Sequence, residues 1–186
     1  MKKSELKENI IKTASELFYQ NGYNSTGINE IIQKSGIAKA TLYNHFESKE
    51  DLCLAYLKYM NENFLIRIKD YCYAKPATKS RTLSIFDFLE DFFQEKSFNG
   101  CWCIKTISEL PQNNKKIRKE IQNQKIQFID LISDLAKVNY KGKTSKFKKS
   151  KARQIYLLYE SAVGESHLHQ MNWPIKEAKN ICNQII

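Results

Sequence analysis

The residues best suited to chemistry lie between positions 35 and 49, where small, basic and aromatic side chains surround two large apolar ones. Lys39 can donate hydrogen bonds to guanine O6 and N7 or to a phosphate, and the methyl groups of Ala40 and Thr41 can contact the methyl group of thymine. Tyr43 offers a further donor at the height of the phosphates. These residue types favour contact with the major groove and backbone of DNA.

A tight turn precedes this segment, as a helix-turn-helix requires. The sequence Ser35-Gly36-Ile37-Ala38 supplies it, because Gly36 can take a left-handed conformation at the end of a helix. The small residues that follow let the N-terminal end of the next helix approach the base edges closely. We therefore predict a helix-turn-helix over about residues 27–46.

The second helix of this motif has a defined phase. Leu42 and Phe46 are four residues apart and must face the core, so Tyr43 and His45 point elsewhere. Thr26 is expected to cap the N-terminus of the first helix of the motif, at about residues 27–34, to contact phosphate, or to do both. The expected DNA-binding residues are Thr26, Ala38, Lys39, Ala40, Thr41, Tyr43, Asn44, His45 and Lys49.

Apolar residues recur at spacings of three and four along the whole chain, which predicts an all-α protein. Ser48 to Asp51 fits the capping-box pattern and opens a long helix that Lys75-Pro76 breaks. A ninth helix is expected to start at Pro174. The other expected helices cover about residues 4–20, 27–34, 39–46, 78–96, 101–110, 114–138 and 149–170.

The charge of the chain does not locate a DNA-binding face. The net charge is +10 over 186 residues, but residues 1–50 hold seven Lys and six Glu. The densest basic run, Lys141 to Arg153, is interpreted as a solvated loop. Sequence-independent coating of DNA, driven by net charge, remains an alternative. No signal peptide and no membrane-spanning run is recognised, so a cytoplasmic protein is expected.

Residues 10–52 resemble the DNA-binding domain of TetR/AcrR-type transcriptional regulators. The resemblance implies an N-terminal three-helix DNA-binding domain over 1–48 and a larger helical ligand-binding and dimerisation domain over 49–186. It further implies a homodimeric, ligand-responsive repressor on a near-palindromic operator. Ala40 stands where many relatives have glycine. The residues that carry the resemblance are Ala14, Leu17, Phe18, Gly22, Tyr23, Thr26, Ile31, Ser35, Gly36, Lys39, Thr41, Leu42, Tyr43, His45, Phe46 and Ser48 to Leu52.

Two sets of residues are expected to serve the larger domain. Several aromatic residues could border an apolar cavity for a small-molecule effector, although core packing explains most of them equally well. Gly164 would permit close approach of two helices in a dimer. The pocket candidates are Phe86, Phe93, Trp102, Tyr156, Tyr159 and His167, and the dimer candidates are Ile155, Ala162, Val163, Gly164, Ile175, Ile181 and Ile185.

The cysteines support an alternative function. A thiol-based redox-sensing regulator could use Cys101 and Cys103, although buried thiols are the simpler interpretation. Their one-residue spacer is poor for a zinc site, and His167 and His169 point to different sides of a helix. No catalytic motif is evident. We therefore expect no metal, no cofactor and no enzymatic activity.

Overall fold

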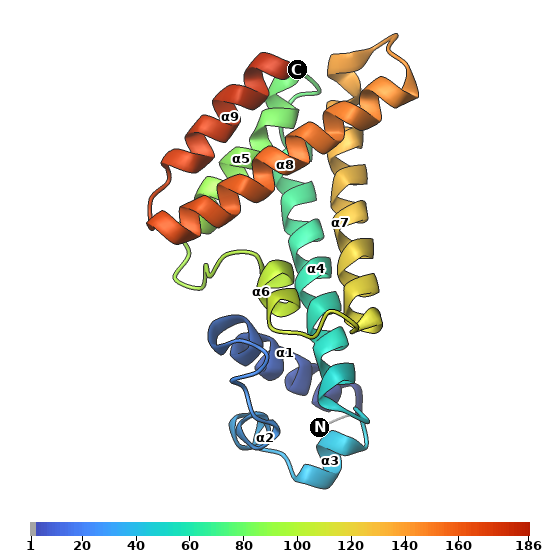
Figure 1. Cartoon of the computed structure of the whole chain (residues 1–186), viewed down its shortest axis with the longest axis vertical. Coiled ribbons are helices and arrows are strands. Elements are labelled where there is room, and N and C mark those ends of the chain that lie inside the picture. The colour runs from blue at the N-terminus through green and yellow to red at the C-terminus, as the bar shows by residue number, and fades with distance from the viewer. Residues whose placement is uncertain (1–2) are drawn as a thin grey trace. The chain divides into compact units, whose positions relative to one another are not determined.

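The computed structural model describes residues 3–186, and every regular element within that range is helical (Figure 1). The all-α prediction is confirmed. The elements are α1 (Lys3–Asn21), α2 (Ile28–Ser35), α3 (Lys39–Tyr43), α4 (Lys49–Tyr73), α5 (Lys79–Phe93), α6 (Trp102–Ser108), α7 (Lys115–Ala136), the 3-10 helix η1 (Lys137–Tyr140), α8 (Ser145–His169) and α9 (Trp173–Ile185).

Several helix boundaries differ from the sequence prediction, and two of them have a clear local cause. α3 ends at Tyr43, but a further turn, in which the Phe46 amide donates to the Leu42 carbonyl at 3.0 Å, keeps Phe46 in the core. α8 begins at Ser145 because the hydroxyl of Thr144 accepts from the Phe147 amide at 3.3 Å and caps the helix. The basic run from residue 141 to 153 is therefore largely helical.

The chain forms two compact units, and α4 and α7 contribute to both. The first unit comprises the chain up to Asn63 together with Trp102–Gln122, and the second comprises Phe64–Cys101 and Asn123–Ile186. The division expected after residue 48 thus differs from that of the structure. The N-terminal half of α4 belongs with α1 to α3 because it buries Leu52, Tyr56 and Leu57.

The core of the first unit follows the stripe expected for α1. Ile10, Ala14, Leu17 and Phe18 are all buried, and the Phe18 ring lies 5.5 Å from that of Tyr56 on α4. The start of α4 is confirmed as a capped terminus. There the Asp51 amide donates to the Ser48 hydroxyl at 3.1 Å, and this hydroxyl donates to the Asp51 carboxylate at 2.7 Å.

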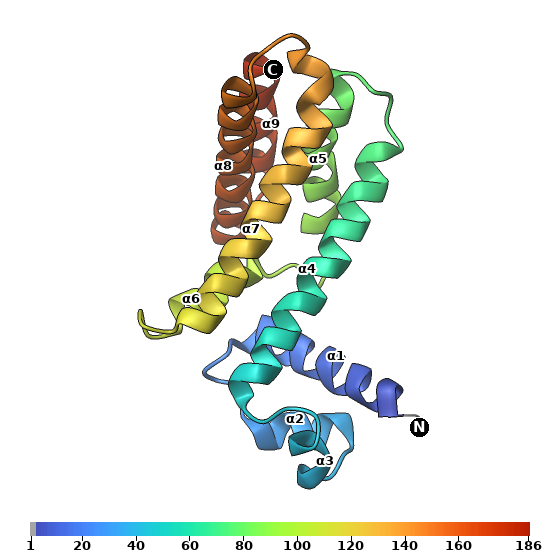
Figure 2. The same ribbon diagram turned by 90° about the vertical axis from the view of Figure 1, so that its right-hand side faces the viewer.

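In the second unit, α9 packs against both α5 and α8 (Figures 1 and 2). The core is rich in aromatic rings: Phe128 lies 4.9 Å from Tyr159 and 5.1 Å from Phe64, both in edge-to-face geometry. The buried hydroxyl of Thr82 donates to the Leu135 carbonyl at 3.1 Å, which joins α5 to the end of α7.

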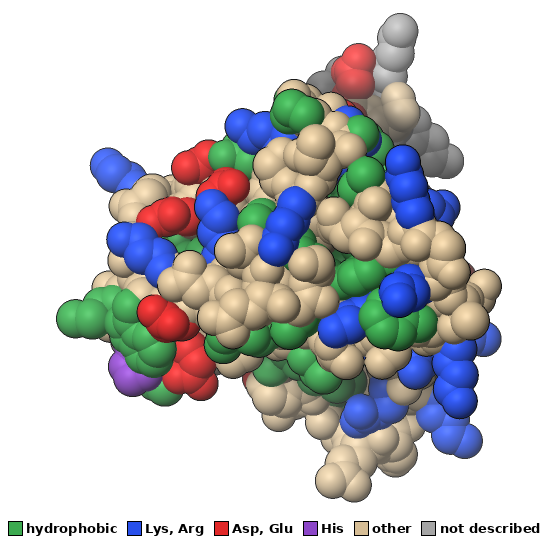
Figure 3. Space-filling view, turned by 90° about the horizontal axis from the view of Figure 1, so that it is seen from above, with side chains coloured by type: hydrophobic (Ala, Val, Ile, Leu, Met, Phe, Trp, Pro, Cys, Tyr) green, Lys and Arg blue, Asp and Glu red, His purple; other side chains and the backbone are tan. Residues whose placement is uncertain are grey.

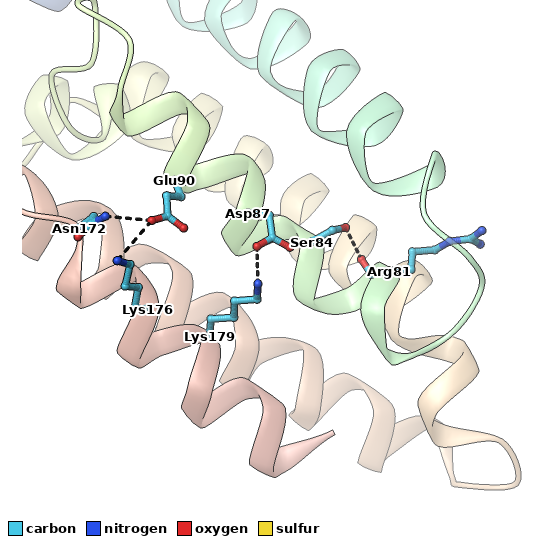
Figure 4. A network of polar contacts seen from close by, with 7 residues as sticks. All are labelled: Arg81, Ser84, Asp87, Glu90, Asn172, Lys176 and Lys179. Atoms are coloured by element: carbon cyan, nitrogen blue, oxygen red, sulfur yellow. Dashed lines mark hydrogen bonds and ion pairs between the residues drawn. The ribbon is translucent and has the colours of Figure 1, made fainter.

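Polar contacts complete the packing of α9 on α5 (Figure 4). Asp87 pairs with Lys179, and Glu90 accepts a hydrogen bond from Asn172 at 2.9 Å. Lys176 also approaches Glu90 at 3.9 Å. The two helices are therefore fixed in register by charges on their partly exposed faces as well as by apolar burial.

The surface is mixed in character. Figure 3 shows Lys and Arg side chains gathered at the right-hand edge of one face, with acidic side chains toward the left. The side chains of Lys141 and Lys143 in the basic run are exposed, as expected. None of the helices in residues 3–186 combines the length and apolarity needed to cross a bilayer.

Two isoleucines of α7 give a matched test of this core. Ile132 is fully buried, whereas Ile126 on the same helix is 55% exposed. We expect Ile132→Ala to lower the free energy of unfolding by about 2–5 kcal/mol, because it leaves a cavity. Ile126→Ala should change it by less than about 0.5 kcal/mol. Urea unfolding followed by circular dichroism measures both, and equal effects would contradict the assigned packing.

Candidate nucleic-acid interface

The turn between α2 and α3 has the geometry predicted from its sequence. Gly36 adopts a left-handed conformation with φ 68°. Its amide donates to the Gln33 carbonyl at 3.3 Å, and the Ile37 amide donates to the Ile32 carbonyl at 3.3 Å. These two bonds form a Schellman motif, which satisfies carbonyls at the end of α2 and redirects the chain into α3.

Two apolar residues hold α3 and the turn that follows it. Leu42 is fully buried and Phe46 is 5% exposed, while Tyr43 between them is 43% exposed. The ammonium of Lys7 on α1 lies 5.6 Å from the centroid of the Phe46 ring. The phase predicted from the spacing of Leu42 and Phe46 is therefore the one in the structure.

The opposite flank of α3 is accessible. Ala38, Lys39, Ala40 and Asn44 are exposed together with Tyr43, and Thr41, His45 and Lys49 are partly exposed. A flank of small residues with one lysine, one tyrosine and one histidine can approach base edges and donate to phosphates. Within the first unit, eight of the nine expected DNA-binding residues thus have accessible side chains.

Thr26 is the exception, and the expectations for its side chain are corrected. It is fully buried, and its hydroxyl lies 2.8 Å from the Gly22 carbonyl and 3.2 Å from the Leu17 carbonyl. The N-cap of α2 is Gly27, without a side-chain cap. The hydroxyl therefore closes the turn between α1 and α2 and does not reach a phosphate.

Lys49 has a partner within the first unit. Its ammonium lies 4.4 Å above the Tyr23 ring, a cation–π contact. Partial burial lowers the pKa of this ammonium. The contact fixes the start of α4 beside the end of α1. If Lys49 contacts a phosphate, its ammonium would interact with the phosphate and with the Tyr23 ring at the same time.

Residues outside the expected site connect α6 to α1 and to the turn that precedes α2. The Glu109 carboxylate accepts from the Asn24 amide at 2.6 Å, and the Asn24 side chain donates back to the Glu109 carbonyl at 2.8 Å. Lys105 donates to the Tyr19 carbonyl at 2.9 Å. Gly22, at φ 93°, leaves room for this carboxylate, since a Cβ there would lie 2.6 Å from Glu109.

The expected pocket residues do not all belong to the same unit. Trp102 belongs to the first unit, whereas the other five belong to the second. Phe86 and Tyr159 are buried core residues with rings 6.1 Å apart. Phe93, Tyr156 and His167 are partly exposed, and His167 shares a 2.8 Å hydrogen bond with Asn99.

A surface hollow of about 390 Å³ lies elsewhere in the second unit, between α4 and α5. The Arg67 guanidinium stacks over the rings of Phe88 and Phe92 and also pairs with Glu95. The hollow is lined by Arg67, Asp70, Tyr71, Phe88, Asp91 and Phe92.

The expected dimer residues fall into two groups. Ile155, Ala162, Val163 and Ile175 are buried inside the second unit, so their side chains cannot face a partner as proposed from the sequence. Their stripes are the faces by which α8 and α9 join the core. Gly164 and Ile181 are exposed and Ile185 is partly exposed.

The two cysteines of the Cys-Trp-Cys segment differ in environment. Cys103 is buried in the first unit, whereas Cys101 is partly exposed in the second, where Lys125 donates to its sulfur at 3.2 Å. Lys125 also pairs with Glu160 at 2.6 Å. His169 faces Glu165 at 3.3 Å. Over residues 3–186 no group of His, Cys, Asp and Glu is arranged to hold a metal ion.

The N-terminal segment matches a known family. Residues 10–56 match the family model described as bacterial regulatory proteins, tetR family. The HTH-type transcriptional regulator YerO of Bacillus subtilis is 38% identical over 115 residues, which are 60% of this chain and 39% of YerO. QacR of Staphylococcus aureus, also an HTH-type transcriptional regulator, is 48% identical over 52 residues, 28% of each chain.

Solved structures share the fold over the whole chain. SCO4454, a TetR-family transcriptional regulator from Streptomyces coelicolor, has a TM-score of 0.87 at 21% identity and covers 100% of this chain and 94% of its own. The reduced form of NemR from E. coli has a TM-score of 0.86 at 20% identity, with coverages of 98% and 97%. The TM-scores show a shared fold, and at such low sequence identity they show the fold alone.

The helix-turn-helix and the nine-helix arrangement of the described residues define the class of a helical DNA-binding regulator. Residues 10–56 thus match the tetR family model, and the fold of the chain is similar to that of the TetR-family regulator SCO4454. It spans 39 to 64% of the length of the curated relatives named YerO, FasR, fatty acid metabolism regulator protein and the lacX 3′-region regulator.

The buried hydroxyl of Thr26 gives a prediction for the first unit. Thr26→Val keeps the shape but leaves two carbonyls without their donor, so we expect a loss of about 1–3 kcal/mol in the stability of α1 and α2. Thr41→Val, on a partly exposed side chain, is the matched control. Hydrogen exchange of the α1 and α2 amides measures the loss, and equal protection in both variants would contradict the assigned role.

Proposed function

We propose that this chain is a homodimeric, ligand-responsive repressor that places α3 of each subunit in the major groove of a near-palindromic operator. The observation that carries the proposal is the phase of α3: Leu42 and Phe46 are buried, and Lys39 and Tyr43 are exposed. Half-sites would then be separated by one helical turn, ~34–36 Å, or a multiple of it. Such a protein acts where the chromosome is, which supports the cytoplasmic location, and the proposal includes no catalytic step.

The exposed faces of α8 and α9 support the dimer. Leu157, Ser161, Gly164 and Leu168 share one exposed face of α8 at helical spacing. Space beside Gly164 is open, so another helix can approach closely there. Ile181 provides an exposed apolar side chain on α9. The proposed interface therefore replaces the buried residues first expected with the outward residues of the same two helices.

The contacts of α6 support a response to a ligand. Through Glu109 and Lys105, α6 holds Asn24 and Tyr19, which lie in and beside the turn that precedes α2. A shift of α6 would therefore change the position of α2 and α3 without any change in the interface residues themselves. The hollow between α4 and α5 is a place in the second unit where a small molecule could bind.

Sequence-independent coating of DNA is the competing function, since the net charge of +10 would attract any polyanion. It requires no particular orientation of α3. The defined turn at Gly36 and the buried position of Leu42 favour the operator-binding alternative, because they orient one flank of one helix outward.

The reading flank gives a direct prediction. On an operator selected from random DNA, Lys39→Ala and Tyr43→Ala should each weaken binding by about 1–3 kcal/mol at fixed salt. Lys58→Ala, on an exposed lysine of α4, removes the same charge elsewhere in the first unit and is the control. Unchanged affinity in the first two variants, or an equal loss in the third, would remove α3 from the interface.

The dimer gives a second prediction. Leu157 is 64% exposed in the protomer, so Leu157→Glu should leave the fold intact but place a charge in the proposed interface and shift the protein to monomers. Ile126→Glu makes the same change on α7, outside that interface, and should remain dimeric. Light scattering coupled to size-exclusion chromatography measures the mass, and a persistent Leu157→Glu dimer would refute this face.

A further inference from the structure

A thiol, an ammonium and a carboxylate meet in the second unit at residues the proposed function does not use. Lys125 on α7 lies between Cys101 and Glu160 on α8, donating to the sulfur at 3.2 Å and to the carboxylate at 2.6 Å. The Lys125 and Glu160 side chains are each 19% exposed. The Tyr156 ring lies 5.9 Å from the ammonium. The group is thus partly shielded from water but open on the side of the thiol.

Cys101 differs in this respect from the other four cysteines of the chain. Cys53, Cys72, Cys103 and Cys182 are all buried. Burial raises the pKa of the Cys53 and Cys182 thiols to about 12 and also raises that of Cys72. The thiols of Cys53, Cys72 and Cys182 are therefore protonated at neutral pH, and all four buried thiols are out of reach of a solute. Cys101, in contrast, is partly exposed and lies beside the Lys125 ammonium.

The neighbours of Cys101 are those that a nucleophilic thiol needs. The thiolate is the reactive form, and an adjacent lysine stabilises it. Burial, followed by the nearby sulfur, raises the pKa of Glu160 to about 7, so this carboxylate can take up a proton near neutral pH. Lys125 can then stabilise the thiolate while Glu160 holds the proton.

We propose that Cys101 is a peroxide-sensing thiol that hydrogen peroxide or an organic hydroperoxide oxidises to sulfenic acid, with Lys125 and Glu160 assisting. The thiol gives its proton to Glu160, and the thiolate attacks one peroxide oxygen. The S–O bond forms as the O–O bond breaks, so sulfur loses two electrons and the peroxide gains them. The departing hydroxide, or alkoxide, takes the proton from Glu160 and leaves as water or an alcohol.

The position of Cys101 next to α6 suggests how its oxidation could regulate DNA binding. This regulatory inference rests on the proposed function. Cys101 is the last residue of its segment in the second unit, and the next residue, Trp102, begins α6 in the first. Oxidation replaces the sulfur that accepts from Lys125 with a larger polar group. The resulting change at the N-terminus of α6 would act on the contacts that α6 makes with Tyr19 and Asn24.

The test exposes the reduced full-length chain to hydrogen peroxide and maps oxidised peptides by mass spectrometry after trapping sulfenic acid with dimedone. We expect the trapped product at Cys101 and not at the four buried cysteines. Loss of the ammonium should reduce the thiolate fraction, so Lys125→Met should slow the reaction about tenfold or more. Lys179→Met breaks a different ion pair of the same unit and should react like the parent chain.

Further variants separate chemistry from folding. Lys125→Arg keeps the charge and should retain most of the oxidation rate at Cys101, even if Lys125→Met loses stability. Glu160→Gln removes the proton acceptor and should slow this oxidation. A rate at Cys101 equal to that of the urea-unfolded chain, or unchanged in Lys125→Met and Glu160→Gln, would overturn the proposal.

Operator binding is measured separately on the same samples. We expect oxidation to lower affinity in the parent chain but not in Cys101→Ser. Oxidation without loss of affinity would overturn the regulatory part. Failure of the reduced chain to bind any selected operator would instead refute the proposed function, and the rates at Cys101 would still decide the thiol chemistry.

Discussion

The burial of Leu42 and Phe46 is the constraint on which the proposed DNA-binding face depends. These two side chains fix the rotation of a five-residue helix that is too short to be stable by itself. Gly36 determines where that helix begins, and Lys7 above the Phe46 ring covers its far end. The outward position of Tyr43 and Lys39 follows from packing on the inner side, not from any property of the exposed residues.

In the same unit, polar contacts position the proposed DNA-binding helix from behind. Thr26 closes the turn after α1, Asn24 in that turn pairs with Glu109, and Gly22 makes the space this pairing needs. The start of α2 is therefore set jointly by α1 and by α6, which lies much later in the sequence. A regulator needs a coupling of this kind if its remaining helices are to influence the position of α2 and α3.

The sequence predicted the helices well because apolar residues recur at helical spacing and several helix ends carry a recognisable capping residue or glycine. Ser48, Gly36 and the stripe of α1 have in the structure the roles that their types indicated. The period shows which face is buried but not what it is buried against, so Ile155 and Ile175 were assigned to a dimer when they belong to the protomer core. For the same reason Trp102, a residue of the first unit, was grouped with aromatic residues of the second unit.

Contacts between residues far apart in the sequence could not be predicted from one chain. The Lys125–Glu160 pair joins two helices, and its meeting with Cys101 depends on the turn before α6. The hollow beside Phe88 and Phe92 likewise depends on how α4 and α5 pack. Thr26 was mistaken for a cap because a threonine before a helix usually caps it, whereas here its hydroxyl serves the preceding turn.

The sharing of α4 and α7 between two cores has a consequence for protein engineering. A fragment cut after residue 48 would lose Leu52, Tyr56 and Leu57, and with them much of the apolar surface on which α1 rests. A chimera that transplants the helix-turn-helix of this chain would have to carry residues through Asn63 together with this chain's own 102–122 segment. Recombination between such regulators should therefore succeed when it uses three junctions, after residues 63, 101 and 122, rather than a single one.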